Sequence, residues 1–143
     1  MNVHIIFHTK SATPMRGTDL PRIHDYIGGV IKGLNANPIA IGGVEDHIHI
    51  LSTLPKTMAL SDFVRAIKAE SSRWIKGVVS CYRVFSWQEG YGAFSVSASK
   101  IDVVKSYIGN QQEHHRTKSF KEEYEEFLQA YDMQYDERYL END

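Results

Sequence analysis

The chain has 143 residues, of which 42% are hydrophobic and 24% charged, and its formal net charge is −2. This length is enough for a buried core, and we expect one domain over residues 1–143. No run of about twenty apolar residues is present, so a transmembrane helix and a membrane partner are not expected. The single cysteine, Cys81, excludes an internal disulfide framework, and no signal-peptide pattern is visible, so we expect a cytoplasmic protein.

The acidic residues are concentrated at one end of the chain. Residues 1–121 carry 15 Lys and Arg against 9 Asp and Glu, a net charge of +6, whereas residues 122–143 carry 1 against 9, a net charge of −8. The overall balance is not that of a typical nucleic-acid-binding protein, but the body is mildly basic. Basic residues spread in this way usually belong to a solvated helix face. Near a phosphoryl-transfer site they would also bind the DNA backbone.

The first half of the chain predicts a strand, a helix and a hairpin. Residues 2–9 form an apolar strand. Asp19 is expected to cap a helix that runs to about Leu34, with Pro21 in its first turn. A hairpin follows over residues 38–53.

The second half predicts a helix over residues 61–76 and one or two strands within residues 82–97. Ser99 is expected to cap a helix over residues 99–115, and a last helix is expected over residues 119–131. The resulting order, β-α-β-β-α-β followed by helices, predicts an α+β, ferredoxin-like core with an antiparallel sheet.

Two histidines, His47 and His49, stand on the second predicted strand of the hairpin. Residues two apart on a strand point to the same face, so both imidazoles project together while Ile48 points the other way. They supply two ligands for a metal ion, although this spacing alone is more often structural.

Tyr107 and Gln111 are four residues apart in a predicted helix and therefore share one face. A phenol nucleophile and a neutral oxygen ligand would then lie side by side. An isolated tyrosine is usually an amphipathic surface residue, but its combination with the histidine strand favours a functional role.

The His-apolar-His strand and the Tyr-x-x-x-Gln helix together resemble the single-tyrosine HUH transposases of small bacterial insertion sequences, a superfamily that includes REP-associated tyrosine transposases. The resemblance covers nearly the whole chain, through residues 42–49, 60–62, 71–74, 87–96 and 135–140. It implies an enzyme that cleaves and rejoins single-stranded DNA through a 5′-phosphotyrosine intermediate.

By the same resemblance, Tyr107 is the nucleophile, and His47, His49 and Gln111 bind Mg²⁺ or Mn²⁺. Imidazole ligands alone would suit zinc, whereas a phosphodiester substrate favours the two harder ions. The resemblance also implies DNA with hairpin ends and a homodimer in which the tyrosine helix of one subunit completes the other's site.

Three alternatives stay open at this point. One is a host-retained relative that acts on repeated palindromic DNA. Another is a non-catalytic nucleic-acid-binding module on the same core. The third is a metal-dependent phosphodiesterase that releases free products.

Other polar residues near these motifs are left outside the ligand set. His114 and His115 are either a DNA contact or a solvated helix end. Asp46 is a turn residue that would also be placed for a hydrogen bond to a histidine ring. His4 and His8 are interpreted as structural.

Overall fold

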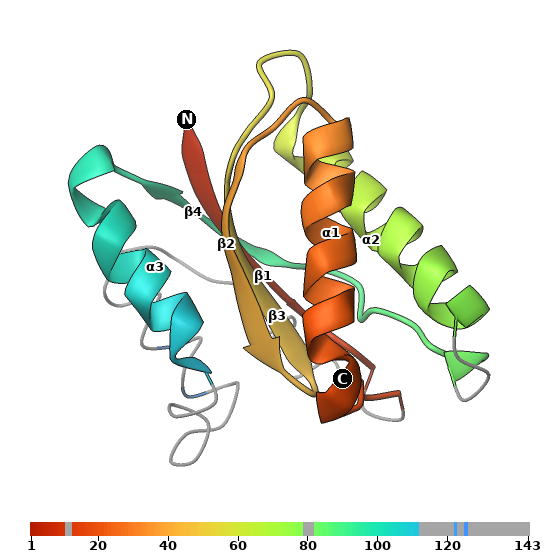
Figure 1. The fold of residues 1–143 in the computed structure, drawn as a ribbon. Helices are drawn as coiled ribbons and strands as arrows, with labels where there is room; N and C mark the ends of the chain where they lie inside the picture. The colour runs from red at the N-terminus through yellow and green to blue at the C-terminus, as the bar shows by residue number, and fades with distance from the viewer. Residues whose placement is uncertain (11–12, 79–81, 112–121, 123–124, 126–143) are drawn as a thin grey trace.

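We describe the computed structural model of the chain over residues 1–10, 13–78 and 82–111, together with Glu122 and Glu125. Its centre is a four-stranded sheet in the order β2-β3-β1-β4, in which every neighbouring pair is antiparallel (Figure 1). The strands are β1 (Asn2–His8), β2 (Pro38–Val44), β3 (His47–Thr53) and β4 (Gly92–Val96).

Helices α1 (Leu20–Gly33) and α2 (Leu60–Val78) connect the strands, and helix α3 (Ile101–Gly109) follows β4. The element order and the strand order are those of a ferredoxin-like α+β fold, which confirms the fold predicted from the sequence. In the described part of the chain, no helix is long and apolar enough to cross a membrane.

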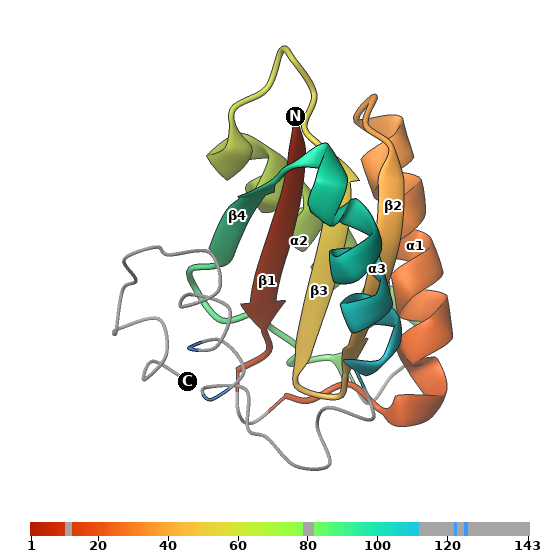
Figure 2. The same ribbon diagram turned by 90° about the vertical axis from the view of Figure 1, so that its left-hand side faces the viewer.

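The sheet separates two layers of helices. Helices α1 and α2 cover one face and α3 covers the other (Figures 1 and 2). Alternate strand residues face opposite layers, so Ile5 of β1 and Ile48 of β3 pack in the core with α1 and α2. On the other face Leu51 packs with Val104 and Ile108 of α3. The same alternation places the histidines of β3 on the α3 side.

The start of α1 differs from its prediction. Asp19 directly precedes the helix, but its side chain makes no capping hydrogen bond. Its carboxylate instead accepts hydrogen bonds from Tyr82 Oη at 2.6 Å and from Arg16 Nε at 2.9 Å. These bonds, that of Arg16 first, lower the pKa of Asp19, while burial raises the pKa of Tyr82. Asp19 therefore ties the start of α1 to the segment after α2.

The helix that carries Tyr107 also begins differently. Ser97 precedes a 3₁₀ turn, Ala98–Lys100, and α3 begins only at Ile101, so Ser99 is not its cap. The stretch before it contains one strand, β4, and an isolated bridge between Trp87 and Thr9. The predicted helix to residue 115 is also too long, because α3 ends at Gly109 and the backbone of Asn110 is not helical, so Gln111 lies beyond its end. Residues 112–115 lie outside the described residues, as does the last predicted helix apart from two positions.

The indole of Trp87 makes a buried hydrogen bond that α2 provides. Trp87 Nε1 donates to Ser71 Oγ at 3.0 Å, and its ring packs edge-on against Phe7 and Phe85 with centroids 4.8 and 5.0 Å apart. Ser71 is fully buried. This bond joins α2 to the loop that leads into β4.

We expect Ser71→Ala to lower the free energy of unfolding by about 1–3 kcal/mol, because it leaves the buried indole N–H without its acceptor. Urea unfolding of the variant measures this loss. Ser72→Ala is the matched control, since Ser72 is only partly buried on the same helix. Equal midpoints for the two variants would contradict the prediction.

Candidate functional site

His47 and His49 lie on β3, a central strand of the sheet, and both side chains are buried. They point to the same face, with ring centroids 5.1 Å apart, while Ile48 lies in the core on the opposite face. The structure therefore confirms the strand geometry that the spacing of the histidines predicts.

The turn before His47 is held tightly. Gly43 has a φ of +148°, and a Cβ there would lie 2.3 Å from the carbonyl oxygen of His47, so only glycine fits. The carbonyl groups of Glu45 and Asp46 accept backbone hydrogen bonds from Met15 and Thr9, at 2.8 and 2.9 Å. The turn thus holds His47, the first residue of β3, in a fixed position.

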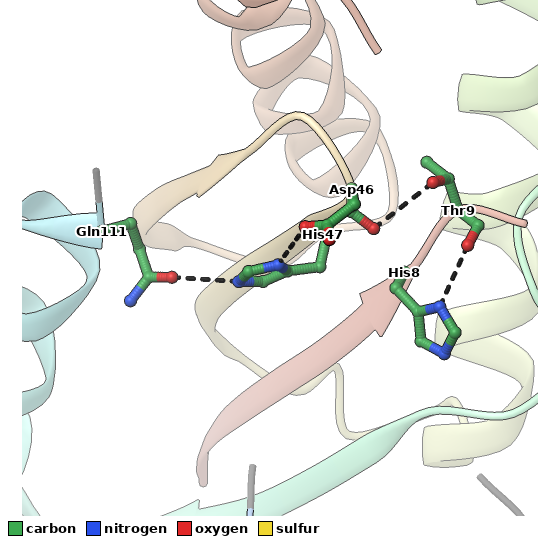
Figure 3. A network of polar contacts seen from close by, with 5 residues as sticks. All are labelled: His8, Thr9, Asp46, His47 and Gln111. Carbon is green, nitrogen blue, oxygen red and sulfur yellow. Dashed lines mark hydrogen bonds and ion pairs between the residues drawn. The ribbon is translucent and has the colours of Figure 1, made fainter. Parts of the chain in front are cut away.

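The His47 ring lies between two oxygen atoms (Figure 3). Its Nδ1 is 2.8 Å from Asp46 Oδ1, and its Nε2 is 3.1 Å from Gln111 Oε1. If Nδ1 donates to the carboxylate, Nε2 carries a lone pair that faces the amide oxygen. Three arrangements relieve this contact: a second proton on the ring, an amide turned to offer its NH₂ group, or a cation held by both atoms.

The His49 ring lies against His4 and Tyr107 as well as His47. Its Nδ1 lies 2.9 Å from His4 Nε2, and its ring centroid lies 5.8 Å from that of Tyr107 at an interplanar angle of 67°. Tyr107 is partly exposed, whereas Gln111 is buried. One chain therefore brings together all four residues that the sequence singles out, with Tyr107 beside His49 and Gln111 beside His47.

A glycine sets the distance between α3 and the sheet. Gly42 of β2 pairs with His49 in the strand register. A Cβ at Gly42 would lie 2.5 Å from the carbonyl oxygen of Ile108 and 2.9 Å from its Cγ2. The backbone of α3 thus touches β2 directly beside His49, between the positions of Tyr107 and Gln111.

His4 is the site residue that sequence reasoning missed. It is fully buried, and besides its contact with His49 its ring lies 5.9 Å from that of Phe94. The antiparallel register pairs Ile6 with His49, which puts His4 diagonally opposite on the same face. Alternation along β1 indicates a shared face with Ile6, but the sequence does not show the register.

The remaining predicted residues are placed as follows. His8 is buried, and its Nδ1 lies 3.0 Å from the carbonyl oxygen of Thr9. His114 and His115 lie outside the described residues. Among described residues, no three His, Cys, Asp or Glu side chains form a possible metal site.

The site thus combines paired histidines on a central strand of a ferredoxin-like sheet with a tyrosine from the following helix and a glutamine just beyond the end of that helix. Residues 1–111 match the family described as IS200-like transposases. The chain belongs to this family, and its function is that of a transposase. No curated protein sequence matches the chain significantly.

Two solved structures share the fold. One is a candidate transposase from Deinococcus radiodurans R1, with 20% identity, a TM-score of 0.57, and coverage of 78% of this chain and 90% of the other. The other is a REP-associated tyrosine transposase bound to a REP hairpin, with 14% identity, a TM-score of 0.59, and coverage of 80% and 67%. At these identities the likeness establishes the fold.

Proposed function

We propose that the protein is a single-tyrosine HUH transposase that cleaves and rejoins single-stranded DNA. Tyr107 is the nucleophile in this proposal, and His47, His49 and Gln111 hold a divalent ion. The observation that carries the proposal is the arrangement of these four side chains on one face of the sheet, with a buried His47–Gln111 contact of 3.1 Å and Tyr107 against His49.

The donor atoms suit a divalent ion. Adjacent ligands of an octahedral ion with bonds of about 2.1 Å lie roughly 3.0 Å apart, close to the separation of His47 Nε2 and Gln111 Oε1. A cation held by both atoms would also remove the repulsion between these two acceptors. All three ligands are neutral, so a bound ion would keep its charge to polarise a phosphate. The amide ligand and a phosphate substrate favour Mg²⁺ or Mn²⁺.

The chemistry of the chain's own residues is a displacement at phosphorus. The hydroxyl of Tyr107 gives up its proton to solvent as its oxygen bonds to the scissile phosphorus. The bond from phosphorus to the 3′ oxygen breaks, and that oxygen takes up a proton from solvent. The products are a 5′-phosphotyrosine and a free 3′-hydroxyl. The new link conserves the ester, so the reverse attack by a 3′-hydroxyl rejoins DNA without ATP.

The proposed substrate is single-stranded DNA that carries a hairpin. Two observations support it: residues 1–121 have a net charge of +6, and one structural neighbour is bound to a REP hairpin. The same neighbour favours a second candidate, a host-retained relative that performs this chemistry on repeated palindromic DNA.

A labelled-strand assay tests the proposed function. We expect an oligonucleotide taken from the DNA that flanks the gene to become attached to the protein when Mn²⁺ is added. A strand labelled at its 3′ end should carry the protein, whereas a strand labelled at its 5′ end should yield a free shorter product. A metal-dependent phosphodiesterase would release both products free, and equal cleavage of a fully paired duplex would contradict the substrate.

We expect Gly42→Ala to reduce adduct formation by about 10- to 100-fold, because the added Cβ displaces α3 and a small misplacement of a reacting group has this cost. The same assay measures the loss, with circular dichroism to check the fold. Gly28→Ala is the control, since a Cβ there would meet Ile41 Cδ1 at an ordinary 3.6 Å. Equal activity of the two variants would show that the contact of α3 with Gly42 does not position Tyr107.

A further inference from the structure

His4 faces His49 from the neighbouring strand, 45 residues away in the sequence. The two side chains are buried, with His4 Nε2 2.9 Å from His49 Nδ1 and ring centroids 5.2 Å apart. Their strands are hydrogen-bonded in register, and Phe94 of β4 lies against the other side of His4. The contact is therefore built into the sheet and does not depend on a loop.

The position of a proton decides whether His49 can bind a metal ion. A neutral imidazole that presents a lone pair at Nε2 carries its hydrogen at Nδ1. In His49 that hydrogen points to His4 Nε2, and in His47 the corresponding hydrogen points to Asp46 Oδ1. Each of the two candidate histidine ligands thus has an acceptor for its Nδ1 hydrogen. For His49 this acceptor is a neutral ring, and for His47 it is a carboxylate.

We propose that His4 is a positioning residue that accepts the Nδ1 hydrogen of His49 and so holds the ring in the tautomer and orientation that metal binding needs. The inference rests on the proposed metal site. His4 acts only through His49 and touches neither the ion nor the DNA. It carries its own proton at Nδ1, because its Nε2 must be the acceptor.

Two variants separate this role from simple packing. His4→Phe keeps a buried ring but removes the acceptor, whereas His4→Gln places an amide oxygen near the position of the imidazole Nε2. Ile5→Val, a buried change on the other face of β1, controls for lost stability alone. Thermal unfolding of all three shows whether they fold.

The first measurement is the tautomer of His49 in metal-free protein, from long-range ¹H–¹⁵N spectra at a pH above the usual titration range of histidine. We expect the proton at Nδ1 in the unchanged protein, in Ile5→Val and in His4→Gln, and a mixture of tautomers in His4→Phe. The second is Mn²⁺ affinity by calorimetry. We expect His4→Phe to weaken it by about 10- to 100-fold, as the loss of such a hydrogen-bond partner does, and His4→Gln to restore most of it.

The outcomes are distinct. If His4→Phe leaves both the tautomer and the Mn²⁺ affinity unchanged, the inference is wrong while the proposed function stands. If Ile5→Val weakens Mn²⁺ binding as much as His4→Phe, the effect is one of stability and the inference is again wrong. If the unchanged protein binds no Mn²⁺ although His49 carries its proton at Nδ1, the proposed metal site itself fails, and the inference fails with it.

Discussion

Tyr107→Phe is expected to abolish the covalent protein–DNA adduct while leaving the fold and DNA binding in place. The phenylalanine ring retains the contact with His49, whose centroid lies 5.8 Å away, and only the attacking oxygen is lost. Removal of a covalent nucleophile costs on the order of 10⁴- to 10⁶-fold in rate, so no adduct should be visible. Tyr107 is partly exposed, so we expect the variant to remain folded.

Denaturing gels with a 3′-labelled strand measure the adduct, and fluorescence anisotropy with the same strand measures binding. Tyr26→Phe is the matched control, because Tyr26 stacks on Trp74 at 4.5 Å, among the helices on the other face of the sheet. The control should retain full activity. An adduct formed by Tyr107→Phe would assign the nucleophile to another residue.

The sequence predicted the parts of the site that depend on local geometry. His47 and His49 share a face because a strand alternates, and Tyr107 and Gln111 share a face because a helix repeats near four residues. The fold order then brought the helix after β4 onto the face of β3 that carries the histidines. The structure agrees on the two histidines and on the placement of α3. It differs on the helix itself, because α3 ends at Gly109 and Gln111 contacts His47 from beyond that end.

The parts that depend on tertiary contacts could not be predicted. His4 joins the site through the register of β1 against β3, which hydrophobic alternation does not fix. Gly42 matters because α3 crosses it within contact distance, and this is visible only once both elements are placed. Asp19 has the residue type and position of a helix cap, but its carboxylate accepts hydrogen bonds from Arg16 and from the hydroxyl of Tyr82, 63 residues away. The contact with Tyr82 could not be predicted from the local sequence.

A mixture of His49→Ala and Tyr107→Phe proteins is expected to stay inactive. In the structure, α3 packs on its own chain through the approach of Ile108 to Gly42, and Gln111, just beyond the helix, lies 3.1 Å from His47 of the same chain. These contacts describe a site built within one chain, whereas the family resemblance implies exchange between subunits. A homodimer stays a prediction, but under this arrangement every site in the mixture carries one lesion.

The amount of activity that the mixture recovers, and not only whether it recovers any, distinguishes the two arrangements. If α3 were exchanged in a dimer, half of the randomly mixed dimers would be heterodimers, each with one intact site, and about a quarter of all sites would be active. Co-expression with two different tags confirms that heterodimers form if the protein dimerises. Mixing each variant with unchanged protein shows that neither inhibits its partner. Recovery of about a quarter of the adduct formed by the unchanged protein would establish exchange. Activity at background level would instead follow from the direct contact of α3 with the β2–β3 hairpin of the same chain, because a helix held there places Tyr107 beside His49 of its own chain.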